Sequence, residues 1–205
     1  MKEKNLIAKA EFLELTKQAF LKKGYRGVSL RNAAAKAGKT TGFVYIYFKD
    51  KNDIFEHLVG PLVEKINAKL IDKDMSFDPT LKTGVSLKEW VANYMRFLME
   101  LAENQSEEMD LLFLKSQGSK FANFKNELIE KAVRRSAKEF RKLKRTPDFS
   151  GQEVSRFFSW NIVGFVVNTS LEVIKNKSSK AEIEKYEAEI TAFIYNGWKG
   201  LVDFS

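Results

Sequence analysis

Cysteine is absent from the 205-residue sequence, and histidine occurs once, at His57. The chain therefore has no disulfide and no thiolate nucleophile, and one histidine without a recognisable context does not anchor a catalytic triad. A metal site would depend on carboxylates, and neither an EF-hand loop nor a Gly-rich phosphate loop is present. Catalysis by carboxylates alone stays open, but the sequence argues against an enzyme and predicts no metal and no cofactor.

Long apolar runs are also missing. The longest, Phe157 to Val167, is broken by Ser159, Asn161 and Gly164, and it is shorter than the roughly 18 residues that a membrane span needs. The N-terminus has no hydrophobic segment of the signal-peptide kind. With 44% hydrophobic and 30% charged residues, the composition is typical of a soluble globular protein. We expect a cytoplasmic protein without a membrane partner.

The positive charge is concentrated at the N-terminus. Residues 1–51 hold twelve Lys and Arg residues and four acids. This segment accounts for the whole net charge of +8, and the remainder is neutral. A lysine-rich solvated helix face is one explanation, but an excess confined to one quarter of the chain favours contact with a polyanion.

Helical spacing dominates the chain, and no segment alternates with a period of two, so we predict an all-α fold. Lys4–Lys23 form an amphipathic helix stopped by Gly24, and the helix that begins near Asp50 should be kinked by Pro61. Residues 72–86 are the expected flexible joint. We place a DNA-binding domain at residues 1–50 and a regulatory and dimerisation domain at 51–205. Further helices are expected near Leu87–Glu103, Glu107–Ser116, Phe121–Arg145, Gly151–Asn176 and Ala181–Leu201.

Two short helices separated by a glycine turn follow the first helix. One should begin after Ser29, whose hydroxyl can cap it, and end at Gly38. The next runs from about Thr40 to Tyr47. This arrangement is a helix-turn-helix, in which the second helix is thin enough to enter the major groove of DNA.

The same segment resembles the TetR family of bacterial transcriptional regulators. The pattern covers about 30 residues at fixed spacing, whereas the rest of the chain carries no signature that we can match. The matching residues are Phe20, Gly24, Tyr25, Ser29, Leu30, Arg31, Ala34, Ala37, Gly38, Thr40, Gly42, Tyr45, Tyr47, Phe48 and Lys51. Val28, Ala33 and Lys39 depart from the usual pattern, which leaves the individual DNA contacts open.

The resemblance implies a homodimer whose last two helices form a four-helix interface, with a ligand cavity in each body. It also implies a repressor that binds a palindromic operator and is released by a small molecule. The alternative is a DNA-binding protein without an effector, acting architecturally or through a protein partner.

Candidate DNA contacts lie in and around the second short helix. Thr41 and Gly42 are the candidates for base edges, because glycine lets the backbone approach and a threonine methyl can meet a thymine methyl. Hydroxyl and ammonium groups are candidates for phosphate oxygens. The complete set of predicted DNA contacts is Ser29, Arg31, Lys39, Thr40, Thr41, Gly42, Tyr45, Tyr47 and Lys51.

The body is rich in aromatic residues, which are more often core than cavity lining. Two amides among apolar neighbours would nevertheless need partners if they were buried. We therefore predict an apolar pocket with a few polar groups, for an apolar or aromatic effector. Its candidate lining residues are Trp90, Tyr94, Phe97, Phe113, Asn161, Phe165 and Asn168. The helix at 151–176 is apolar nearly all round and, with residues 188–202, could supply the dimer surface.

Overall fold

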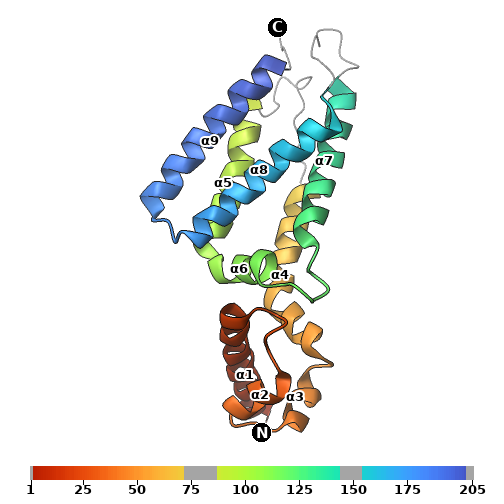
Figure 1. Cartoon of the computed structure of the whole chain (residues 1–205), viewed down its shortest axis with the longest axis vertical. Helices are drawn as coiled ribbons and strands as arrows, with labels where there is room; N and C mark the ends of the chain where they lie inside the picture. Colours follow the sequence, from red (N-terminus) through yellow and green to blue (C-terminus); the bar gives the residue numbers. More distant parts are fainter. Residues whose placement is uncertain (1, 72–86, 144–153, 202–205) are drawn as a thin grey trace. The chain divides into compact units, whose positions relative to one another are not determined.

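The computed structural model describes residues 2–71, 87–143 and 154–201, and helices are the only regular structure in these ranges (Figure 1). The all-α prediction is confirmed. The predicted joint at residues 72–86, like the expected helical residues at 144–145 and 151–153, lies outside the described residues. The helices are α1 (Lys2–Lys23), α2 (Leu30–Lys36), α3 (Thr41–Tyr47), α4 (Lys51–Ile71), α5 (Leu87–Asn104), α6 (Ser106–Leu114), α7 (Phe124–Leu143), α8 (Arg156–Lys175) and α9 (Lys180–Leu201).

Local signals in the sequence explain several helix ends. Gly24 and Gly38 both have positive φ angles, +67° and +64°, which is the left-handed conformation that favours glycine after a helix. Thr40 caps α3, since its Oγ1 accepts a hydrogen bond from the Phe43 N–H at 3.1 Å. Pro61 lies inside α4, where it cannot donate to the His57 carbonyl; the kink predicted there stays a prediction.

The cap predicted at Ser29 is wrong in its chemistry. Ser29 occupies the residue before α2 and has an extended backbone, but its hydroxyl makes no capping hydrogen bond. Helix α2 is instead held by two buried alanines, Ala33 and Ala34. The Ser29 side chain is exposed to solvent.

The chain packs into two compact units. Unit 1 comprises Met1–Lys65 and Glu107–Lys125, and unit 2 comprises Ile66–Ser106 and Asn126–Ser205. These are packing units, so the boundary predicted between residues 50 and 51 stays a prediction.

Unit 1 has an aromatic core drawn from several helices. Phe12 and Phe20 of α1, Phe48 after α3 and Phe55 of α4 are all fully buried. The Phe55 ring lies 5.1 Å from that of Phe20, measured between centroids. The Phe12 ring also lies 6.4 Å from that of Phe43 in α3, and α2 packs on α1 and α3. Such packing holds the two seven-residue helices, which have little stability of their own.

Unit 1 also contains nearly all of helix α6, and Lys17 joins that helix to α1. The Lys17 ammonium contacts the carboxylates of Glu107 at 2.6 Å and Glu108 at 2.8 Å, and only 14% of its side chain is exposed. Burial alone would lower the pKa of Lys17, but the hydrogen bonds that its ammonium donates to both glutamates outweigh burial and raise that pKa well above its usual range. The Lys17 hydrogen bond lowers the pKa of Glu107.

Replacing Lys17 with methionine should reduce the free energy of unfolding by about 1–3 kcal/mol, because charge-assisted hydrogen bonds in a half-buried setting are lost. Chemical denaturation measures this, with Lys22→Met on the same helix as the control, since Lys22 is exposed. A lowered pKa of the Glu107 carboxyl stabilises the fold when the pH is above 4.5, the ordinary pKa of that group. The stability deficit of Lys17→Met should therefore shrink as the pH falls below 4.5. A deficit that does not change with acid pH would contradict the ion pair.

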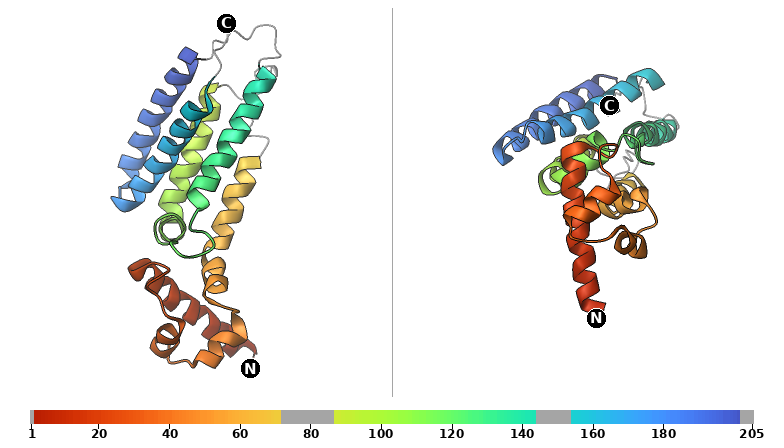
Figure 2. Two further views of the ribbon diagram at one scale, coloured as in Figure 1. Left: turned by 45° about the vertical axis from the view of Figure 1, so that its right-hand side comes forward. Right: turned by 60° about the horizontal axis from the view of Figure 1, so that its bottom comes forward.

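Unit 2 is a bundle of the end of α4 with α5, α7, α8 and α9. Helices α8 and α9 lie side by side, and α5 packs against both (Figure 2). The core that joins them includes Met95 and Met99 of α5, Val173 of α8, and Ile194 and Trp198 of α9. Methionine adapts to irregular gaps between helices.

Helix α8 is the one described helix that is long and apolar enough to cross a membrane by length and composition. Core helices of soluble proteins pass the same test, so this is weak evidence for a span. The sequence expectation concerned uninterrupted apolar runs, and the longest run in this helix is broken by Ser159, Asn161 and Gly164. The average hydropathy of the whole helix is nevertheless high enough for a span. In unit 2, α8 packs on α5 with one face and keeps several phenylalanines exposed on the other.

Candidate functional site

The outer face of α3 is exposed to solvent. Val44 is fully buried and fixes the helix from below. Gly42, Tyr45 and Ile46 therefore point outward together, at spacings of three and four residues. Tyr45 is 58% exposed and Ile46 is 75% exposed. Together with Gly42 they form a small exposed face that another molecule could contact.

Space beside Gly42 is open. A β-carbon at this position would meet only the Thr40 hydroxyl oxygen, at 3.7 Å. Neither packing nor backbone conformation within unit 1 therefore requires a glycine here. The absence of a side chain leaves the surface flat beside Tyr45, which permits close approach of another molecule.

The other predicted DNA contacts surround this face or support it. Arg31 on α2 is exposed. Lys39 places its ammonium 5.3 Å from the centre of the Phe43 ring, and Tyr47 packs on the same ring at 5.0 Å. Thr41 is half-buried at the start of α3. The structure thus brings the predicted contacts of the turn and of α3 together in the segment 39–47. Ser29 and Arg31 lie at the start of α2.

Lys51 is the exception, because its ammonium is directed into unit 1. Its Nζ donates to the carbonyl oxygens of Tyr25 at 2.9 Å and Val28 at 3.0 Å. It also lies 4.3 Å from the centre of the Tyr25 ring. Burial lowers the pKa of this ammonium. Lys51 therefore fixes the turn between α1 and α2, and a phosphate contact by the same group stays a prediction.

Replacing Lys51 with methionine should lower the free energy of unfolding by about 1–3 kcal/mol, because two buried carbonyls lose a charged donor. Thermal or denaturant unfolding measures the loss. The matched control is Lys49→Met, since the Lys49 side chain is exposed. Unchanged stability together with weaker DNA binding would contradict the positioning role and favour the phosphate contact.

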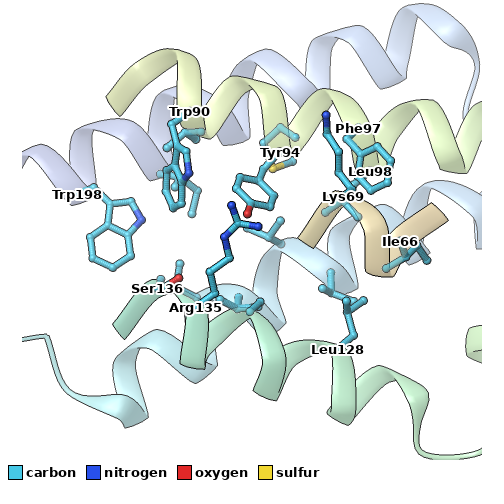
Figure 3. Close-up of a pocket in the computed structure, with 18 residues that line it drawn as sticks. Ile66, Lys69, Trp90, Tyr94, Phe97, Leu98, Leu128, Arg135, Ser136 and Trp198 are labelled. Carbon is cyan, nitrogen blue, oxygen red and sulfur yellow. The ribbon is translucent and has the colours of Figure 1, made fainter. Parts of the chain in front are cut away.

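Unit 2 contains a cavity of about 120 Å³ between α4, α5, α7, α8 and α9 (Figure 3). Its wall is almost entirely aliphatic and aromatic, with a few polar side chains. The lining residues are Ile66, Lys69, Trp90, Val91, Tyr94, Met95, Phe97, Leu98, Leu128, Ala132, Arg135, Ser136, Ile162, Val163, Val166, Val167, Ile194 and Trp198.

The predicted pocket residues fall into two groups. Trp90, Tyr94 and Phe97 lie on one face of α5 and line the cavity. The others are not among its lining residues. Phe113 packs on Phe124 in unit 1, with ring centres 5.6 Å apart, and Asn161, Phe165 and Asn168 are exposed on α8.

Sequence reasoning did not single out Lys69, Arg135 or Ser136 among the cavity residues. Arg135 and Ser136 are adjacent on α7, a helix with many charged residues. Their neighbour Arg134 is 77% exposed and pairs with Glu130. No local pattern separates the arginine that faces the cavity from the one that faces solvent, except its register with Leu128 and Ala132, which line the same cavity seven and three residues earlier.

An exposed phenylalanine patch lies on the outer side of α8 and α9. We define this patch as Phe157, Phe158, Phe165 and Phe193; Phe157 is 80% exposed and Phe193 is 65% exposed. The rings of Phe165 and Phe193 are in contact across the two helices, 6.1 Å between centres. Phe158 also contacts Trp198, whose indole lines the cavity, at 6.0 Å. The patch and the cavity thus share the Phe158–Trp198 contact.

Comparison with known proteins agrees with these features. Residues 12–58 match the family model described as "Bacterial regulatory proteins, tetR family", which confirms the resemblance seen in the sequence. No curated protein matches the chain.

Solved structures match the fold along nearly the whole chain. NalD of Pseudomonas aeruginosa, the secondary repressor of a multidrug efflux pump, has a TM-score of 0.66 at 15% identity, over 95% of this chain and 97% of that one. A Clostridium perfringens protein described as a fatty acid metabolism regulator has 0.62 at 23%, over 91% and 97%. FadR of Bacillus subtilis, solved with stearoyl-CoA, has 0.60 at 15%, over 92% and 98%. At these identities the likeness concerns the fold.

Proposed function

We propose that this chain, whose helix-turn-helix segment is that of the tetR family of bacterial regulatory proteins, is a transcriptional repressor that a small molecule releases from DNA. The observation that carries the proposal is the outer face of α3. Gly42, Tyr45 and Ile46 are exposed together on a short helix that the fully buried Val44 holds against unit 1. An α-helix presented in this way fits the major groove.

The charge distribution supports DNA as the partner. The net charge of +8 resides in residues 1–51, which include α1 to α3. Positive charge near a recognition helix provides the sequence-independent part of the affinity, and the groove contacts provide specificity. In this proposal Thr41, Gly42 and Ile46 meet base edges, while Tyr45, Tyr47 and the basic side chains meet phosphates.

We place a homodimer contact at the phenylalanine patch of α8 and α9. Four large aromatic side chains exposed on adjacent helices form the kind of apolar surface that marks a protein interface. A twofold dimer presents two copies of α3 and so matches a palindromic operator, whose half-sites are one DNA turn or a multiple of it apart. The other face of α8 is engaged with α5.

The cavity of unit 2 is the proposed effector site. It lies between five helices and is mostly apolar, as small-molecule sites are. The solved relatives include a repressor, NalD, and a FadR bound to stearoyl-CoA, so repression and effector binding both occur on this fold. An effector that prefers a conformation unable to bind the operator lowers DNA affinity by the ratio of its two affinities.

The test is fluorescence anisotropy with labelled duplexes. DNA from immediately upstream of the protein's own coding region is compared with a shuffled duplex across a series of salt concentrations. Saturable binding of two chains to the native duplex, well above binding to the shuffled one, is the expected result. Equal and salt-sensitive binding to both would contradict a specific operator there, and no binding at low salt would refute the DNA function.

A further inference from the structure

The polar side chains of the unit 2 cavity are cations or hydrogen-bond donors, which bears on the kind of ligand that the cavity can bind. The inference rests on the proposal that this cavity is the effector site. Two of the lining side chains, Lys69 and Arg135, are cations, and among the lining residues that the structure describes there is no carboxylate. The remaining polar side chains are Tyr94, Ser136 and the two tryptophans, all of which carry a hydrogen-bond donor. The wall therefore favours negative charge.

From this lining we infer that the cavity binds an acidic amphiphile, with a carboxylate headgroup at Arg135 and an apolar tail along the aliphatic wall. Figure 3 shows the Arg135 guanidinium extending from α7 toward the hydroxyl of Tyr94 on α5. Ser136, the next residue on α7, adds a second hydroxyl to the same wall. A guanidinium can donate two parallel hydrogen bonds to one carboxylate, which fixes its orientation.

The apolar part of the wall suits a hydrocarbon tail. Leu98 of α5, Leu128 of α7 and the aliphatic residues of α8, Ile162, Val163 and Val166, offer no polar atoms in their side chains. Lys69 lies beside Phe97, its ammonium 5.8 Å from the ring centre, so this cation packs against an aromatic face. A cavity of about 120 Å³ is below the range of about 300–1,000 Å³ typical of drug-sized ligands, so a short tail fits it best.

Binding energetics make the headgroup decisive. A carboxylate leaves water only if charged or polar groups replace its hydration, and Arg135 with neighbouring donors can do so. An organic cation with the same tail would instead meet the positive charges of Lys69 and Arg135, with no carboxylate among the described lining residues to offset them. A neutral alcohol would gain the apolar contacts alone.

The experiment compares three probes that share one tail: octanoate, octan-1-ol and octylammonium. Isothermal titration calorimetry with the intact protein at neutral pH measures each dissociation constant without DNA. Octanoate is expected to bind about tenfold or more tightly than octan-1-ol, which is the ratio a charge-assisted hydrogen bond gives. Octylammonium should bind more weakly than either. Equal or tighter binding of the alcohol or the amine, or no binding of octanoate, would overturn the inference.

Variants assign the preference to Arg135. Arg135→Met should remove the advantage of octanoate and leave octan-1-ol within about twofold of its wild-type value, because the apolar wall is kept. Arg135→Lys should retain part of the advantage. The matched control is Arg134→Met, which makes the same change in charge at the neighbouring, exposed position. Loss of the preference in both methionine variants would contradict a local contact.

The outcome is independent of the DNA experiment. Calorimetry reports on the cavity whether or not an operator has been found, and anisotropy reports on DNA whether or not a ligand is present. A protein that binds its operator but prefers octan-1-ol would refute the acidic ligand and leave the regulator intact. A protein that prefers octanoate but binds no DNA would support the acidic ligand and refute the proposed DNA function.

Discussion

Phe193→Asp is expected to convert the protein from a dimer to a monomer while unit 2 stays folded. The Phe193 side chain is 65% exposed in the single chain, so the substitution removes little packing within the subunit. In the proposed dimer the same position is covered, and an aspartate there would be desolvated without a partner. Interface aromatics of this kind contribute several kcal/mol, so the dimer dissociation constant should rise by about 100-fold or more.

Analytical ultracentrifugation over a range of concentrations measures this change, and thermal unfolding checks the fold. The matched control is Leu6→Asp, which places the same charge at an equally exposed apolar residue of α1 in unit 1. Phe157→Asp, at the other end of the patch, should act like Phe193→Asp. A Phe193→Asp protein that remains dimeric at the wild-type concentration would remove the patch from the interface.

The loss of the dimer should carry over to DNA. A monomer contacts one half-site only and loses the gain that comes from tethering two binding modules. Operator affinity is therefore expected to fall in Phe193→Asp even though α3 is unchanged. If the monomer bound the operator as tightly as the wild type, two-site recognition would be wrong.

Unit 1 was predictable because its signals are local. The glycines at 24 and 38 take the positive φ that stops a helix, and Thr40 caps the next one with its own side chain. Each of these contacts spans only a few residues, so sequence spacing determines them. The prediction failed at Ser29, whose backbone adopts the extended conformation of a cap but whose hydroxyl makes no capping hydrogen bond.

Lys51 shows a second limit of local reasoning. Its position at the start of α4 predicts an ammonium free to meet a phosphate. In the structure it reaches two carbonyls that lie 23 and 26 residues earlier in the chain. Such a contact depends on how α1, α2 and α4 meet, and no spacing in the sequence reports it.

The cavity could be predicted only along single helices. Trp90, Tyr94 and Phe97 share a face of α5 by their spacing alone, and they line the cavity. Arg135 could not be distinguished from Arg134, because α7 is charged on most sides and its register is set by packing between helices. Phe165 and Asn168 lie on the solvent side of α8, since that helix is apolar on both its inner and outer faces and periodicity does not say which is which.

Ile46→Glu is expected to abolish operator binding without unfolding the helix-turn-helix. Ile46 is 75% exposed in unit 1, so folding should change by less than about 0.5 kcal/mol. Against DNA, the new carboxylate would face phosphates of the same charge and lose its hydration in the groove, which costs several kcal/mol. We expect the dissociation constant for the operator to rise by about 100-fold or more.

The control for net charge is Leu15→Glu, which adds the same carboxylate to a half-exposed apolar residue of α1 in the same unit. It should weaken all DNA binding slightly and equally, since it alters only the long-range field. Anisotropy on the operator and on the shuffled duplex separates the two effects. Equal losses in Ile46→Glu and Leu15→Glu would show that the added carboxylate weakens binding through its charge alone, and the outer face of α3 would then not read the operator.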